Sequence, residues 1–199
     1  MNPKSLISAA ALAACAALPA AAQEAGTITF GLGLHQVNPK SDNGTIAGMS
    51  ASVGSSTRPT ITAEYFIRDN LGVELLAALP FKHSVSLDGT RIGTVKQLPP
   101  VVSLQYHFAN GSKVTPFVGL GVNFTTFFDE DSGLGDLKLK NSWGLAAHVG
   151  VDVALNEKAA LRIDARWADI DSKVSLNGAG IGTAEIDPVV YGMSYVWRF

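Results

Sequence analysis

The feature that most constrains this chain is a long-range alternation of apolar residues with small or polar ones. At the end of the sequence, for example, Tyr191, Met193, Tyr195, Trp197 and Phe199 alternate with Gly, Ser, Val and Arg. Successive side chains of a β-strand point to opposite faces, so a period of two indicates a strand with one apolar face. Eight such runs follow one another between residues 27 and 199. The chain is therefore expected to be all-β.

The connections between these runs alternate in length. The tight polar turns are 69–70, 109–113 and 156–158, and the longer connections are 38–57, 129–139 and 172–184, with 88–93 as their short member. An even number of strands, with short turns at one end and longer loops at the other, is typical of outer-membrane barrels.

The composition agrees with a membrane barrel. Hydrophobic residues make up 47% of the chain and charged residues only 16%, against about 25% charged in soluble domains. No run after residue 22 is long enough for a spanning helix, which needs ~20 apolar residues. A closed barrel pairs all its backbone polar groups internally, as hydrocarbon requires. We therefore predict an eight-stranded antiparallel transmembrane β-barrel over residues 23–199.

Residues 1–22 have the pattern of a secretory signal peptide. Lys4 is the only charge, residues 6–18 are apolar, and Ala20-Ala21-Ala22 provides a small-residue cleavage site. As an alternative, Leu12-Ala13-Ala14-Cys15 resembles a bacterial lipobox, which would make Cys15 a lipidated first residue. If Cys15 is removed with the signal, the mature chain has no cysteine and no disulfide.

Other protein classes fit the pattern less well. A soluble lipocalin-like barrel would expose the Gly, Ala, Thr and Ser face, which carries fewer charges than a soluble surface needs. The formal charge of -2 and the lack of a basic cluster give no indication of nucleic-acid binding. His83, Ser84 and Asp88 suggest a lipid-modifying enzyme, but positions 83 and 84 face opposite sides of a strand. The Asp129-Glu130-Asp131 run lacks EF-hand spacing. No catalytic residue, metal or cofactor is predicted.

Five segments resemble the OmpW family of outer-membrane proteins. They are NLGVELLAALPFKH (70–83), TVKQLPP (94–100), PFVGLGVNFTTFFDE (116–130), LKLKNSWG (137–144) and WADID (167–171). The resemblance extends in the same order from about Thr57 to Phe199, and the first loop matches least. It implies a barrel in a Gram-negative outer membrane, surrounded by lipid and lipopolysaccharide, with both termini in the periplasm. It also implies a narrow, largely apolar passage for small hydrophobic molecules, since alkane-uptake proteins belong to the family.

The lumen-facing positions of the predicted strands carry charges of both signs. An eight-stranded barrel is only just wide enough for its own side chains, so these groups are expected to pair and to block the lower barrel. A barrel blocked in this way is not expected to act as a general porin for water-soluble solutes. The alternative is that the charged lumen residues form an ion or proton path. The predicted polar plug consists of Glu64, Glu74, His107, His148, Asp152, Arg162, Asp164, Arg166 and Arg198.

Leu76 and Trp167 are candidates for an apolar constriction above this plug. Leu76 places a large apolar side chain on the lumen-facing parity of its strand. Trp167 would turn inward if a bulge lies near Ala168. Ordinary packing is the alternative for both residues.

Pro80, Pro99 and Pro100 fall in the third and fourth predicted strands. Proline has no N–H for the strand ladder and is rare in paired strands. The sequence thus predicts a weakened seam through which an apolar solute leaves sideways into the membrane. The alternative is a curved strand end above the membrane.

The last strand presents its aromatic residues to lipid. Tyr195, Trp197 and the terminal Phe199 also resemble the signal that barrel-assembly machinery recognises in outer-membrane proteins. As a whole, the sequence predicts a monomeric barrel that aids uptake of small hydrophobic molecules. The alternative is a structural or receptor-type barrel whose loops bind a partner without transport.

Overall fold

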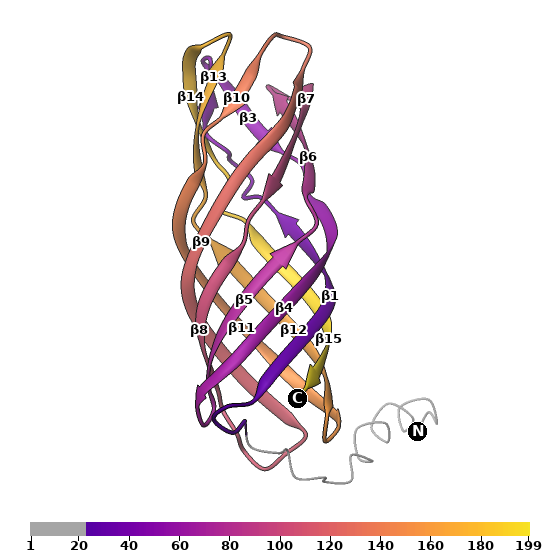
Figure 1. Cartoon of the computed structure of the whole chain (residues 1–199). Helices are drawn as coiled ribbons and strands as arrows, with labels where there is room; N and C mark the ends of the chain where they lie inside the picture. Colours follow the sequence, from indigo (N-terminus) through magenta and orange to yellow (C-terminus); the bar gives the residue numbers. More distant parts are fainter. Residues whose placement is uncertain (1–22) are drawn as a thin grey trace, which may run out of the picture.

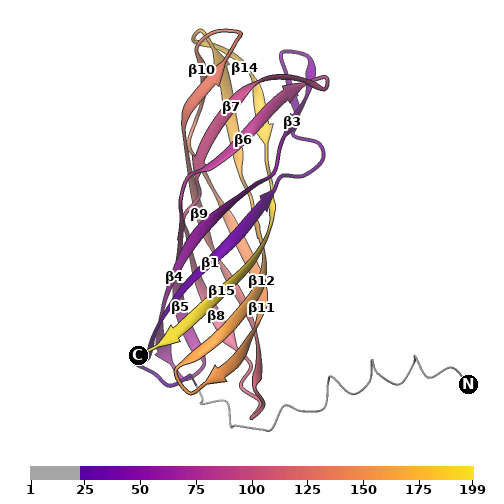
Figure 2. The same ribbon diagram turned by 90° about the vertical axis from the view of Figure 1, so that its right-hand side faces the viewer.

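Eight strands pair antiparallel in a closed ring, and β15 pairs with β1 to complete it (Figures 1 and 2). The strands are β1 (Ile28–Asn38), β4 (Ser56–Arg68), β5 (Leu71–Ala78), β8 (Val101–His107), β9 (Val114–Ser132), β11 (Ser142–Asn156), β12 (Ala159–Ala168) and β15 (Val189–Arg198). This computed structural model describes residues 23–199. The predicted signal peptide, with Cys15, lies outside the described residues. The predicted eight-stranded antiparallel barrel is confirmed.

Shorter strands extend the barrel wall beyond this ring (Figure 1). They are β2 (Thr45–Ile46), β3 (Met49–Val53), β6 (Phe81–Leu87), β7 (Thr90–Leu98), β10 (Leu137–Leu139), β13 (Asp171–Leu176) and β14 (Ala179–Glu185). They pair in the order β10-β13-β14-β2-β3-β6-β7, and β7 pairs with the far half of β9. The longer connections predicted from the sequence therefore fold largely as β-structure.

Two hairpin turns in this extension have a local cause. Asp88 and Gly89 both have positive φ, 47° and 78°, and Asn177 and Gly178 have φ of 51° and 83°. Two consecutive left-handed residues define the turn that best matches the twist of paired strands, and Asp-Gly and Asn-Gly are its favoured sequences. These dipeptides fold the chain back between β6 and β7 and between β13 and β14.

The lower barrel has apolar residues on the outside and polar residues inside. Large exposed hydrophobic side chains, such as Leu34, Leu120 and Leu145, stand on its outer face. The buried alternate positions carry Thr, Ser, Glu, His and Arg. This distribution is the reverse of a soluble core and matches the lipid-facing surface of a membrane barrel.

Two predicted strands are interrupted at their prolines. Segment 71–87 divides into β5 and β6 around Pro80, and segment 94–108 divides into β7 and β8 at Pro99-Pro100. The prolines therefore lie between paired strands rather than within them, because each lacks the N–H that a ladder requires. The inward-facing parity also changes across the first break, since Leu76 and then Phe81 are buried.

Both ends of the described chain lie at the same end of the barrel (Figures 1 and 2). The carbonyl of Gln23 accepts a hydrogen bond from Asn70 in the β4–β5 turn, and the Arg198 N–H donates to Lys158 in the β11–β12 turn. We call this the terminal end, and the opposite end, with β10, β13 and β14, the loop end. Within residues 23–199, no helix has the length and apolar character needed to cross a membrane.

Candidate functional site

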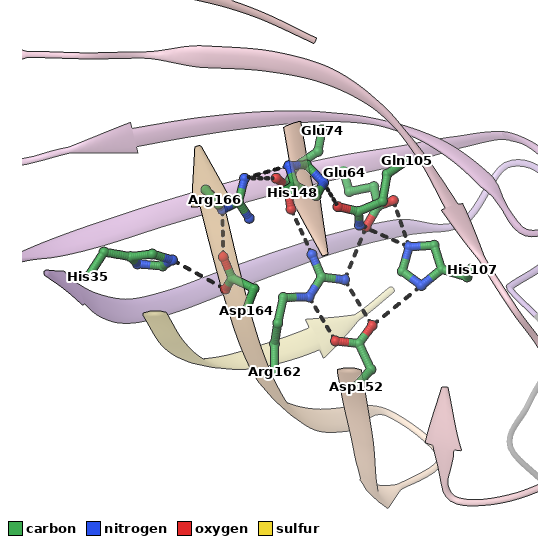
Figure 3. Close-up of polar contacts among 10 residues, drawn as sticks. All are labelled: His35, Glu64, Glu74, Gln105, His107, His148, Asp152, Arg162, Asp164 and Arg166. Carbon is green, nitrogen blue, oxygen red and sulfur yellow. Dashed lines mark hydrogen bonds and ion pairs between the residues drawn. The ribbon is translucent and has the colours of Figure 1, made fainter. Parts of the chain in front are cut away.

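Arg162 of β12 lies at the centre of a polar network inside the lower barrel (Figure 3). Its side chain is 2% exposed. Nη1 donates to Glu74 Oε2 at 2.6 Å, Nε to Asp152 Oδ1 at 2.7 Å, and Nη2 to Glu64 Oε2 at 3.3 Å. The guanidinium also lies 4.5 Å from the ring centroid of Phe117, at cation–π distance. Carboxylates from three other strands thus surround one cation.

Arg166 extends the network toward the loop end. Its Nη1 donates to Glu74 Oε1 at 2.7 Å, so Glu74 bridges the two arginines, and its Nε donates to Asp164 Oδ2 at 2.6 Å. Asp164 Oδ1 lies 3.3 Å from His35 Nε2, and His35 Nδ1 lies 2.6 Å from the Thr60 hydroxyl. The contacts therefore extend from β5 across the lumen to β1.

Two more histidines, His107 and His148, complete the network near Glu64. His107 Nε2 lies 2.9 Å from Glu64 Oε1, and His148 Nε2 lies 2.6 Å from Gln105 Oε1. Gln105 Nε2 in turn donates to Glu64 Oε2 at 2.9 Å. Charged groups held this closely and away from water are strongly coupled.

Glycines on the inner face make room for these rings. A Cβ at Gly119 would collide with the ring of His148, and a Cβ at Gly192 would collide with the ring of His35. Glycine at these positions of β9 and β15 therefore leaves the space that the two histidine rings occupy.

The structure brings most of the predicted plug residues into this one network. Figure 3 shows Glu64, Glu74, His107, His148, Asp152, Arg162, Asp164 and Arg166 together. Arg198 is partly buried near the terminal end of β15. His35 and Phe117 also belong to the network and were not predicted in it, although both occupy inward positions of their alternating strands.

A small apolar cavity of about 40 Å³ lies on the loop-end side of the network. Leu76 borders it and is 6% exposed, packed with Val101, Ala146, Ala168 and Ile170. His148 and Arg166 of the network are also among its lining residues. The lower cavity, as we call it, therefore ends on the charged groups.

Trp167 does not point inward beside Leu76. Its side chain is 42% exposed on the outer face, although the residue borders the lower cavity. The β12 ladders with β11 and β15 run without a bulge from Ala160 to Trp167, so the strand keeps its alternation and Trp167 keeps its outward position. The inward turn expected from a bulge near Ala168 is wrong.

A larger cavity of about 280 Å³, the upper cavity, lies within the loop-end extension. Its wall is mainly apolar and includes Val85, Leu87, Val95, Leu137 and Val174. Gln97 of β7 lines both cavities, so the two adjoin at this residue. We call the two cavities together the apolar compartment, which lies on the loop-end side of the network.

Pro99 lies beside the lower cavity, and Pro80 and Pro100 lie at the same interruption of the strands. The β5–β8 ladder ends at the pair Leu76–Val101, and the β6–β7 ladder begins at the pair Phe81–Gln97. Pro99 lines the cavity between these ladders.

The carbonyls of the other two prolines are satisfied from elsewhere. Pro80 O accepts from Arg58 Nε at 2.9 Å, and Pro100 O accepts from Asn123 Nδ2 and from the Phe124 N–H at 3.1 Å each. The break in the ladder therefore does not leave these carbonyls without hydrogen bonds.

In the described part of the chain, one cluster of three aspartates has carboxylate oxygens close enough together to hold a metal ion. Carboxylate oxygens of Asp169, Asp171 and Asp187 lie within 4.8 Å of one another. Burial and the charges of Asp187 and Asp169 raise the pKa of Asp171. Lys40 Nζ already pairs with Asp187 Oδ2 at 3.0 Å and with Glu185 Oε2 at 2.7 Å. Ordinary ion pairing accounts for these contacts, and we assign no metal here.

The aromatic residues of the last strand lie on its outer face. Tyr195 and Trp197 pack at 4.6 Å between ring centroids. Phe199 is 76% exposed and contacts Phe30 of β1 edge-on at 5.8 Å. The final aromatic residues therefore lie at the junction where β15 closes the ring with β1.

Comparisons with known proteins agree with this architecture. The model of the OmpW family matches residues 24–199. Outer membrane protein W of Salmonella typhi is 38% identical over 98% of this chain and 99% of its own. Outer membrane protein AlkL of Ectopseudomonas oleovorans is 30% identical over 77% of this chain and 72% of its own.

A solved structure shares the fold as well. The crystal structure of the outer membrane protein OprG from Pseudomonas aeruginosa superimposes with a TM-score of 0.79 and 36% identity, covering 89% of this chain and 97% of OprG. The family resemblance noted from the sequence is therefore confirmed. This chain belongs to the OmpW family and is an outer-membrane β-barrel.

Proposed function

We propose that this barrel carries small hydrophobic molecules from the loop end into the upper and lower cavities and releases them sideways into the membrane. The observation that carries the proposal is the abrupt change of lumen chemistry at Arg166 and His148. Apolar walls lie on one side of these residues, and a network of buried ion pairs lies on the other.

The network makes straight passage to the terminal end unfavourable. An apolar solute would have to separate Arg162 and Arg166 from their carboxylates without replacing the lost contacts. Breaking a buried ion pair by removing one partner costs about 3–5 kcal/mol, and Glu74 alone joins both arginines. A solute in the lower cavity therefore has an easier exit through the wall.

The interrupted ladder beside the cavity supports a lateral exit. Between the pairs Leu76–Val101 and Phe81–Gln97, separation of the third and fourth strands breaks no hydrogen bond of their ladder. Leu76 lies at the lower edge of this gap and Pro99 lines it. We infer that Leu76 is the constriction and that Pro80, Pro99 and Pro100 form the exit.

We further infer that the terminal end faces the periplasm and the loop end the exterior. Short turns on the periplasmic side and longer outer connections are general in such barrels. Lipid and lipopolysaccharide then surround a monomer, and the barrel-assembly machinery inserts it by way of Tyr195, Trp197 and Phe199. AlkL is a relative in a family that includes alkane-uptake proteins, which supports an apolar solute.

Reconstitution tests the proposal directly. The purified protein is inserted into vesicles with lipopolysaccharide in the outer leaflet, and entry of radiolabelled octane is compared with swelling in sucrose or glycerol. We expect faster octane entry than in protein-free vesicles and no entry of the polar solutes. Equal octane entry with and without protein would refute transport and favour the structural or receptor role. A lumen plugged along its whole height would favour the structural or receptor role. The two apolar cavities on the loop-end side of the network argue against it.

Cross-linking tests the exit separately. Ala78→Cys with Pro99→Cys, joined by a bifunctional maleimide, should slow octane entry by holding the third and fourth strands together. Leu75→Cys with Val102→Cys is the matched control, because this outward pair lies in the closed part of the same ladder. Equal octane entry through both cross-linked proteins would exclude the lateral route while leaving transport intact.

A further inference from the structure

Three polar atoms in the compartment wall have no hydrogen-bond partner within the described chain. They are Oε1 and Nε2 of Gln97 and Nε2 of His83. Both residues line the upper cavity, whose other lining residues are mostly apolar. More than nine-tenths of buried polar groups in proteins are hydrogen-bonded, so each exception requires an explanation.

The position of Gln97 shows why its amide is unsatisfied. Gln97 is 1% exposed and faces inward on β7, opposite Phe81 of β6 on one side and Phe127 of β9 on the other. Both neighbours are buried aromatic side chains that cannot hydrogen-bond a primary amide. Rotation about the terminal torsion of glutamine meets no sharp barrier, so the amide can turn toward either cavity.

His83 supplies a complementary group on the neighbouring strand. Its Nδ1 lies 2.6 Å from the carbonyl oxygen of Gly54, and because a carbonyl only accepts, Nδ1 carries the proton. The other nitrogen, Nε2, is then an acceptor in the neutral ring. Burial is the main cause that lowers the pKa of His83, and the charge of Arg58 lowers it further, whereas the Gly54 hydrogen bond opposes the change.

The two residues lie on the same inner face. In the β6–β7 ladder His83 is opposite Val95, and Gln97 is two residues farther along the same strand as Val95. Diagonal neighbours of this kind are separated by roughly 7–8 Å, within reach of long side chains or of a small group between them. The His83 acceptor in the wall of the upper cavity thus lies diagonally opposite the Gln97 amide at the junction of the two cavities.

We propose that Gln97 and His83 form a polar anchor, and that the solutes this barrel handles best are amphipathic, with an apolar body and one hydroxyl group. The hydroxyl donates to His83 Nε2 and accepts from the Gln97 amide, while its alkyl chain lies in the upper cavity. This inference rests on the proposed transport function and specifies its substrate class. A pure alkane fills the same space but leaves all three polar atoms unpaired.

Matched probes test the anchor. We would measure binding of 1-octanol and of octane, each ¹³C-labelled at C1, to the full mature chain in lipid nanodiscs, with empty nanodiscs giving the partition into lipid. Octanol should bind roughly 2- to 12-fold more tightly per hydrogen bond gained than octane. Octanol should also shift the side-chain ¹⁵N signal of His83, assigned with His83→Phe, whereas octane should not.

Gln97→Leu removes one half of the anchor and tests its preference for a hydroxyl group. This variant has nearly the same shape and removes an unsatisfied buried amide, so it should fold, and the ratio of octanol affinity to octane affinity should fall toward one. Gln36→Leu is the control, because Gln36 is exposed on β1. Equal octanol and octane affinities in the wild type, or an unshifted His83 signal, would overturn the anchor even if octane still enters vesicles. If octane enters vesicles with the wild-type protein no faster than protein-free vesicles, the proposed function itself is overturned.

Discussion

Replacement of Arg162 by leucine should strongly destabilise the barrel. The guanidinium makes contacts of 2.6, 2.7, 2.9 and 3.3 Å with Glu74, Asp152 and Glu64. Leucine leaves three buried carboxylates without this cation, and removal of one partner from a buried ion pair costs about 3–5 kcal/mol. We expect the free energy of unfolding to fall by that amount.

Urea unfolding of the barrel in thin-bilayer vesicles measures the change. Trp143, Trp167 and Trp197 all lie on the exposed outer face and report the loss of lipid contact through their fluorescence. Lys96→Ala is the control, since its 2.8 Å pair with Asp129 is solvent-exposed and such pairs contribute about 0–1 kcal/mol.

The carboxylates provide a second check on the same reasoning. Adding Asp152→Asn to Arg162→Leu removes one of the uncompensated charges and should recover part of the lost stability. A loss below about 1 kcal/mol for Arg162→Leu alone would show that the network behaves like an exposed one, and would refute its role as a dry plug.

Three further predictions concern other parts of the barrel. Leu76→Ala should widen the constriction and alter octane entry into vesicles, whereas Leu75→Ala, on the lipid face of the same strand, should not. Deletion of Phe199 should reduce insertion by the barrel-assembly machinery in cells, and normal heat-resistant barrel on gels would count against its signal role. Because the fold lowers the pKa of His83, the unfolded chain takes up this proton first, at about pH 6.5. The free energy of unfolding should therefore decline as the pH falls from that value toward the folded pKa of His83. Urea unfolding at several pH values measures this decline, which should be smaller in His83→Gln. An equal decline in the variant would show that another group titrates.

The alternation of residues by itself determined the barrel and most of its interior. In a strand a side chain's parity decides its face, so Glu64, Arg162 and Arg166 could be assigned to the lumen without coordinates. The same rule places Trp167 on the outer face, where the structure has it. The prediction for Trp167 was wrong because it added a bulge that the strand does not have.

Only the tertiary structure decided which lumen residues meet and where the apolar compartment lies. Parity gives no height or partner, so the bridge from Glu74 to both arginines depends on the stagger of distant strands. The unpaired amide of Gln97 depends on the neighbours that β6 and β9 bring to it. Alternation is a local property of the backbone, whereas contact across a lumen depends on how eight strands tilt and close.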